Sequence, residues 1–241
     1  MPAAKNRSQG PGLALQELFW ADSCRLVPSR FPPITLFERV GDPADLEVVF
    51  AIESLGNPRL RDEAGDLVLV PPEQRISGPG CSPIMAAFTH LNPEGSRFSD
   101  GSYGIYYAAA SLETAVAEVS YHQARFLART QEAAIDVDMR CYRVSVRALL
   151  HDLRGLQAQA QYQALFDSEN YGAARQLGAQ LRQSGSLGLV WDSVRHAGGQ
   201  CLGLFNPKAT QPPARQAEHV TLRWDGQGIH EWYLKSDHHR I

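Results

Sequence analysis

Four polar residues stand at the ends of predicted helices and strands or in the loops beside them: Arg97, Tyr107, Glu118 and Ser193. An arginine fork pairs with anionic groups, an aromatic ring attracts a cation, and a carboxylate stabilises positive charge that develops nearby. Each type also has an ordinary structural role, because loop arginines are commonly solvated and serines commonly form turns. Taken one at a time, the four residues do not specify a reaction.

Glu118 is the most informative of the four. It stands between Ala117 and Val119 and follows an almost uncharged turn, TAVA, on a predicted helix. This setting predicts partial burial, and a buried carboxylate needs a partner. His122 lies four residues further along the same helix and is placed to supply one.

The segment that positions Tyr107 and Glu118 has clear local signals. Residues 92–104 form a loop by composition, and residues 104–110 (GIYYAAA) are typical of a buried strand with Ile105, Tyr107 and Ala109 on one face. Ser111 then provides the N-cap of a helix predicted from Leu112 to about Ala128. Its apolar stripe comprises Leu112, Ala115, Val116, Val119, Phe126 and Leu127.

The remaining patterns predict more strands than helices. A short helix is expected over residues 13–20 and two helical pieces over 155–183. Strands are expected over residues 34–40, 67–70, 139–146, 187–191 and 200–205, with a hairpin over 220–234. Residues 1–12 are expected to be disordered. Because strands and helices do not alternate regularly, the predicted fold class is α+β.

Composition narrows the classes of function. The chain has 241 residues, 44% hydrophobic and 20% charged, with a formal net charge of −3, so no basic face for nucleic acid is indicated. We see no apolar run of the ~20 residues that span a membrane and no secretion signal, so we expect a cytoplasmic protein. The cysteines Cys24, Cys81, Cys141 and Cys201 form no CxxC pair, which favours buried thiols over a zinc site or a disulfide framework.

Two blocks of sequence resemble a known family. The segment SRFSDGSYGIYYAAASLETAVAEVSYH is similar to the signature of RES-domain proteins, with an arginine in a Gly/Ser-rich loop, a strand with Y-x-A, and a helix with E-T-A-x-x-E. Downstream, LGLVWDSVRHAGGQCLGLFNP resembles the second block, in which a serine between two strands completes the Arg–Glu–Ser set. The resemblance covers roughly residues 34–206, and it gives no role to Asp192 or to residues 155–183.

The resemblance implies a fold and an activity. The fold would be similar to that of diphtheria-toxin-type ADP-ribosyltransferases, a mixed or antiparallel β-core flanked by helices, formed by residues 21–241 after an N-terminal extension of residues 1–20. RES proteins are toxins encoded beside a helix-turn-helix, Xre-like antitoxin. They consume NAD⁺ as a substrate without a metal, either by hydrolysis or by ADP-ribosylation of a protein.

The same resemblance implies roles for individual residues. Glu118 would stabilise the oxocarbenium-like ribose that forms when nicotinamide leaves. Arg97 would hold the diphosphate or adjoining ribose with its fork, and Arg39 would add a second contact. Tyr107 would face the nicotinamide ring, with Tyr106 as the alternative. Ser193 would hydrogen-bond nicotinamide or ribose.

Two other functions stay open at this point. One is a module that binds a nucleotide without turnover, against which the presence of both Arg97 and Glu118 argues. The other is a serine hydrolase using Ser193 with His196, which lacks the G-x-S-x-G elbow and has its histidine only three residues away. The sequence has no GxGxxG motif, so a Rossmann-type NAD site is not supported.

Overall fold

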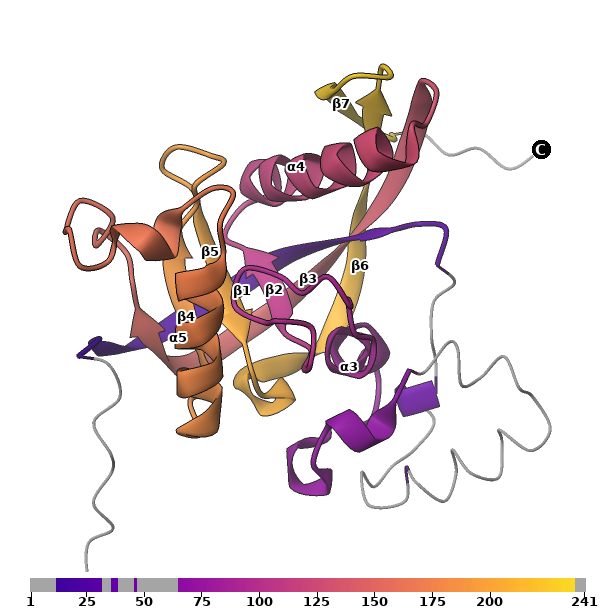
Figure 1. The fold of residues 1–241 in the computed structure, drawn as a ribbon. Coiled ribbons are helices and arrows are strands. Elements are labelled where there is room, and N and C mark those ends of the chain that lie inside the picture. Colours follow the sequence, from indigo (N-terminus) through magenta and orange to yellow (C-terminus); the bar gives the residue numbers. More distant parts are fainter. Residues whose placement is uncertain (1–11, 32–35, 39–45, 47–64, 237–241) are drawn as a thin grey trace, which may run out of the picture.

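A seven-stranded mixed sheet forms the centre of the protein in the computed structural model, which describes residues 12–31, 36–38, 46 and 65–236 (Figure 1). The strand order is β1-β2-β5-β4-β3-β6-β7, and β1 also pairs with β3, so the first five strands of this order close on themselves. The strands are β1 (Leu15–Pro28), β2 (Tyr106–Ala109), β3 (Ile135–Asp152), β4 (Gly188–Asp192), β5 (Gln200–Leu204), β6 (Thr210–Trp224) and β7 (Ile229–Leu234). Only the short β3–β4 pairing is parallel among these pairs. The predicted α+β class with a mixed, largely antiparallel core is confirmed.

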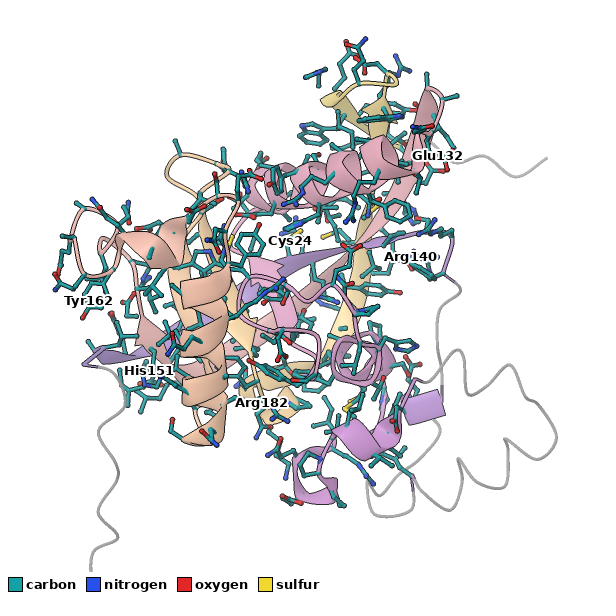
Figure 2. The ribbon with its side chains drawn as sticks, viewed as in Figure 1. Cys24, Glu132, Arg140, His151, Tyr162 and Arg182 are labelled. Carbon is teal, nitrogen blue, oxygen red and sulfur yellow. The ribbon has the colours of Figure 1, made fainter. Side chains whose placement is uncertain are left out.

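Three α-helices flank the sheet: α3 (Ser82–Thr89), α4 (Leu112–Thr130) and α5 (Gly172–Gln183). Buried residues of α4 and α5 pack in one core cluster and those of α3 pack in another. Short 3-10 turns occur at Leu36–Glu38, Leu67–Leu69, Pro72–Gln74, Gln163–Phe166 and Pro207–Ala209. Cys24 on β1 is buried beneath α4 (Figure 2), and all four cysteines are buried and free, as expected.

The segment around β2 and α4 matches its prediction closely. Ile105, Tyr107 and Ala109 pack on the α4 side of the sheet, whereas Tyr106 and Ala108 pack on the α3 side. The Ser111 side chain caps α4 by accepting from the Thr114 N–H at 3.2 Å. The predicted stripe is buried or partly buried except for Phe126, which is 41% exposed.

The helix predicted over residues 13–20 is wrong, because these residues belong mostly to β1. Their backbone pairs with β3 in antiparallel register from Leu15 opposite His151 to Trp20 opposite Val146. Side chains alternate there, with Leu18 buried and Phe19 exposed, which is the period of a strand. This long-range pairing overrides the local pattern, and the strand continues to Pro28 past a register shift between Trp20 and Ser23.

The helix predicted over the first part of residues 155–183 is also wrong. That part forms successive turns, such as Gln159 N–H to the Leu156 carbonyl, and one 3-10 turn at Gln163–Phe166, so only α5 is α-helical among the described residues there. The reason is tertiary, because the Arg97 side chain binds the carbonyls of Leu165 and Asp167, which a helix would use internally.

Two further expectations fall partly on residues that the structure does not describe. Of the strand predicted over 34–40, residues 36–38 form a 3-10 turn and the rest lie outside the described residues, as do residues 1–11 of the expected disordered terminus. Leu67–Leu69 is a 3-10 turn instead of a strand, because the Asp66 side chain accepts from the Val68 N–H. The strands predicted over 139–146, 187–191 and 200–205 and the hairpin are confirmed as β3 to β7, with β3 and β6 longer than expected.

Candidate active site

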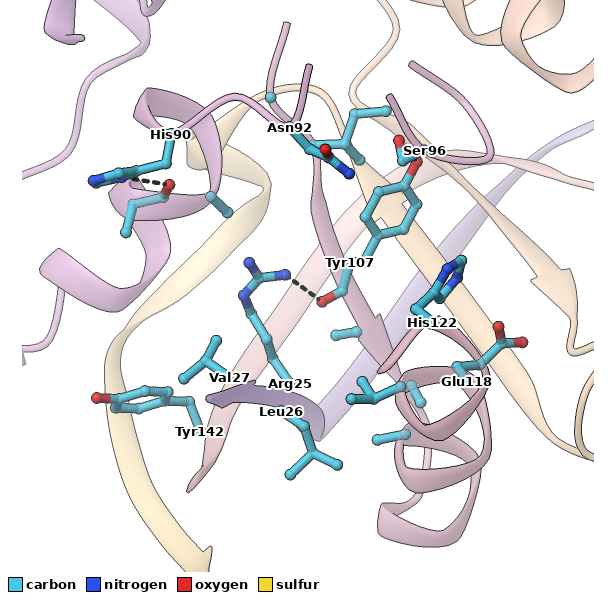
Figure 3. A pocket seen from close by; sticks show the side chains of 18 of the residues that line it. Arg25, Leu26, Val27, His90, Asn92, Ser96, Tyr107, Glu118, His122 and Tyr142 are labelled. Atoms are coloured by element: carbon cyan, nitrogen blue, oxygen red, sulfur yellow. Dashed lines mark hydrogen bonds between the residues drawn. The ribbon is translucent and has the colours of Figure 1, made fainter. Parts of the chain in front are cut away.

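A cavity of about 850 Å³ lies between α4, α3 and the strands β1 and β2 (Figure 3). Its wall is largely apolar and carries a few charged and polar side chains, which is the usual character of a small-molecule site. Of the sequence-predicted site residues, Arg97, Tyr107 and Glu118 line it. Ser193 contacts Glu118 from outside the lining, and Arg39 lies outside the described residues.

Glu118 and Ser193 are joined directly although 75 residues separate them in the sequence. The Ser193 hydroxyl donates to Glu118 Oε1 at 2.6 Å, and its oxygen accepts from the N–H groups of Arg195 at 3.1 Å and His196 at 3.0 Å. These three bonds use the whole hydroxyl group. In this geometry Ser193 holds the carboxylate in place and has no donor left for a ligand.

His122 is not the hydrogen-bond partner of Glu118 in the described structure, although both line the cavity. Desolvation by the surrounding protein lowers the pKa of His122, and the Glu118 carboxylate opposes this effect. Glu118 therefore accepts its hydrogen bond from Ser193. His122 is a neighbouring group that becomes cationic when it takes up a proton. Besides the Ser193 hydroxyl, the Cys201 sulfur also approaches Glu118, at 3.6 Å from Oε1.

Arg97 is buried; it lines the cavity and also contacts the segment that contains Leu165 and Asp167. Its Nη1 donates to the carbonyls of Leu165 at 3.1 Å and Asp167 at 2.9 Å, and its guanidinium lies 4.5 Å from the centre of the Tyr171 ring. Its Nη2 is buried and has no hydrogen-bond partner in the described part of the chain. A buried cationic donor without a partner is costly, so this group is suited to an anionic ligand.

We expect Arg97→Lys to weaken activity although it keeps the charge. An ammonium group cannot bind the two carbonyls and a ligand in the planar geometry of a guanidinium. The predicted result is a loss of roughly tenfold in kcat/KM, the scale of a hydrogen bond to a charged group. The assay is consumption of NAD⁺, the substrate that the sequence resemblance implies, with thermal unfolding measured in parallel because the 163–171 segment also depends on Arg97. An unchanged kcat/KM would show that the planar guanidinium of Arg97 does not bind the ligand.

Tyr107 presents its ring to the cavity and anchors the loop before β2. Its hydroxyl bonds to the Ser96 hydroxyl at 2.8 Å and accepts from the Phe98 N–H at 3.1 Å, and burial raises its pKa. Tyr106, the alternative for facing nicotinamide, points to the α3 side and does not line the cavity. Of the two tyrosines, only Tyr107 is placed to touch a ligand there.

Arg25 on β1 is a cavity residue that the sequence analysis missed. Its Nη1 donates to the Tyr107 carbonyl at 3.0 Å, its guanidinium lies 5.1 Å from the centre of the Tyr106 ring, and its Nε is buried without a partner among the described residues. Burial lowers its pKa, yet an arginine remains charged. The signal in the sequence that could have identified Arg25 is a charged residue between the apolar residues Cys24 and Leu26.

The geometry does not form a serine hydrolase pair. The Nδ1 atom of His196 lies 2.9 Å from the Thr114 hydroxyl, and the bond from His196 to Ser193 comes from its backbone N–H. The imidazole is therefore held against α4 and does not activate the serine as a base.

Two negative findings apply to the described residues alone. No group of three or more His, Cys, Asp or Glu side chains there is arranged to hold a metal ion. None of the helices there is long and apolar enough to cross a membrane.

Comparison with known proteins places this chain in a family. Protein y4oC of Sinorhizobium fredii is 38% identical over 133 residues, which are 54% of this chain and 56% of that protein, so the match spans little more than half of the relative. One chain of the crystal structure of the M. tuberculosis MbcT–MbcA toxin–antitoxin complex aligns with a TM-score of 0.41 and 19% identity, covering 54% of this chain and 73% of that one. Residues 72–225, well over half of the chain, match the RES domain family and include Arg97, Tyr107, Glu118 and Ser193. The chain belongs to the RES domain family.

Proposed function

We propose that this protein cleaves the bond between nicotinamide and ribose in NAD⁺ and acts as the toxin of a toxin–antitoxin pair. The observation that carries the chemistry is the Glu118 carboxylate, held at 2.6 Å by Ser193, in a cavity that two buried guanidinium groups also line. Arg97 and Arg25 both line the cavity, and a guanidinium group there is suited to pair with a diphosphate.

The proposed reaction uses this arrangement in a simple way. As the C1′–N bond breaks, its electron pair leaves with nicotinamide and positive charge develops on the ribose. The fixed Glu118 carboxylate stabilises that charge without having to reorganise. An acceptor hydroxyl then adds to C1′ and loses its proton, and the acceptor is either water or a group on a protein.

The acceptor is decided by one experiment. Purified protein is incubated with NAD⁺ labelled in the adenine ring, with and without a cell lysate. Free ADP-ribose without lysate identifies a hydrolase, whereas a labelled protein band that forms only with lysate identifies a transferase. Intact NAD⁺ in both arms would overturn the proposed chemistry.

The toxin role follows from the family and from the chemistry. An enzyme that drains a central cofactor must be restrained inside the cell, and a cognate Xre-like helix-turn-helix antitoxin would supply the restraint. A carboxylate-bearing segment of that partner would suit the cavity, because an arginine that grips a diphosphate also pairs with carboxylates. The partner would also supply the DNA binding, because this chain has a net charge of −3.

Expression alone is expected to arrest growth and lower cellular NAD⁺ or label a target protein. Co-expression with the neighbouring antitoxin gene is expected to restore growth. Growth curves and cellular NAD⁺ are measured after induction, with the Glu118→Gln variant as the matched control for expression burden. Harmless accumulation of folded wild-type protein without any partner would count against the toxin role and leave the NAD⁺ chemistry to the assay above.

A further inference from the structure

Cys201 on β5 is a buried group that the proposed chemistry has not used. It is 4% exposed, it lines the cavity, and its Sγ lies 3.6 Å from Oε1 of Glu118. This is the same carboxylate oxygen that accepts from Ser193. Two donors from two different segments therefore converge on one oxygen of the carboxylate.

We propose that Cys201 is a positioning residue for Glu118, holding Oε1 together with Ser193 so that Oε2 is the oxygen presented to the substrate. This inference rests on the proposed function and assigns the two carboxylate oxygens within it. No hydrogen bond reaches Oε2 in the described part of the chain, and Glu118 itself lines the cavity. Rotation of the carboxylate would break both contacts to Oε1 at once.

The thiol is in the right protonation state for this role. Burial first, and the Glu118 charge second, raise the pKa of Cys201, so the sulfur keeps its proton and can donate. A protonated thiol is a weak donor and a poor nucleophile. Cys201 is therefore a support for the carboxylate and is not itself a nucleophile.

The other charged or titratable side chains near Glu118 come from three elements. His122 lies on α4, Arg97 lies in the loop before β2, and Arg195 lies in the turn after β4. All three are unchanged in a Cys201 variant. A change in kcat or in the Glu118 carboxyl signal on replacing Cys201 can therefore be assigned to the lost thiol contact.

The test compares Cys201→Ala with Cys201→Ser, which keeps a donor, and with Cys81→Ala, which removes a buried thiol that does not line the cavity. For Cys201→Ala we expect kcat to fall roughly three- to tenfold with little change in KM, because a weak donor to a charged group is lost. Cys201→Ser should stay within about twofold of the wild type, on the same scale.

A second readout does not depend on turnover. In protein carrying ¹³C-labelled glutamate, the Glu118 carboxyl signal is assigned by its absence in Glu118→Gln, and its chemical shift is compared in wild type, Cys201→Ala and Cys201→Ser. The proposal predicts a chemical shift that changes in Cys201→Ala and returns towards the wild-type value in Cys201→Ser, because the thiol contacts the carboxylate. An unchanged chemical shift in a folded Cys201→Ala protein would overturn the role of Cys201. Failure of the wild type to consume NAD⁺ would instead overturn the proposed function and leave this comparison decisive for Cys201.

Discussion

Glu118→Gln is expected to reduce NAD⁺ consumption by a factor on the order of 10² or more, which corresponds to about 2.7 kcal/mol of transition-state stabilisation. The amide has the shape of the carboxylate and can still accept from the Ser193 hydroxyl, so the cavity should keep its form. It has no negative charge to oppose the charge that develops on the ribose. Initial rates at saturating NAD⁺ measure the effect on kcat.

Glu113→Gln is the matched control for this variant. Glu113 lies on the same helix, in its first turn, and is exposed. Its replacement should leave the rate within about twofold and cost at most a few tenths of a kcal/mol of helix stability. Near-normal turnover by a folded Glu118→Gln protein would exclude Glu118 as the catalytic carboxylate.

Arg25→Gln is expected to lower kcat/KM for NAD⁺ by roughly 10- to 100-fold, the scale of a charged hydrogen bond to phosphate. Glutamine is two bonds shorter than the Nη1 arm of arginine and loses the 3.0 Å contact to the Tyr107 carbonyl together with the charge, so thermal unfolding is measured in parallel. Most of the loss should appear in KM, because a group that grips the diphosphate acts in the ground state and the transition state alike.

The control for Arg25 is Arg147→Gln. Arg147 lies on β3, is exposed, and pairs with Glu17 at the surface, where such pairs contribute little. Binding of ADP-ribose by calorimetry adds a measurement that needs no turnover, and Arg25→Gln should weaken it in proportion. If Arg25→Gln and the wild type bind ADP-ribose equally, Arg25 does not contact the diphosphate.

Local signals predicted the parts of the fold that local interactions decide. The N-cap at Ser111, the apolar stripe of α4 and the alternation of Ile105, Tyr107 and Ala109 are all set within a few residues along the chain. Helix and strand periods differ, so such segments can be assigned from sequence alone. The hairpin of β6 and β7 follows the same logic, because its turn residues are adjacent to its strands.

Long-range contacts decide the parts that were missed. Residues 15–20 become a strand because β3 is there to pair with them, more than a hundred residues away. Residues 155–171 stay out of a helix where Arg97 binds the carbonyls of Leu165 and Asp167. Neither partner is visible in the local sequence pattern, so propensity alone gives the wrong answer.

The same contrast applies to the site. Glu118, Arg97 and Tyr107 stood out because they lie in or beside one well-patterned segment, and all three line the cavity. Arg25 lay in residues 21–26, to which the sequence analysis assigned no helix or strand, so nothing connected it to the others. For Ser193 the sequence predicted that the residue belongs to the site. It did not predict that its hydroxyl donates to the Glu118 carboxylate.

The most direct test of the central claim is the release of nicotinamide from NAD⁺ by the purified protein, followed by proton NMR over time. The account predicts that nicotinamide appears in step with the loss of NAD⁺ in the wild type. It also predicts that the rate falls by a factor on the order of 10² or more in Glu118→Gln of equal thermal stability. Intact NAD⁺ after prolonged incubation with folded wild-type protein, or equal release by the two proteins, would contradict it.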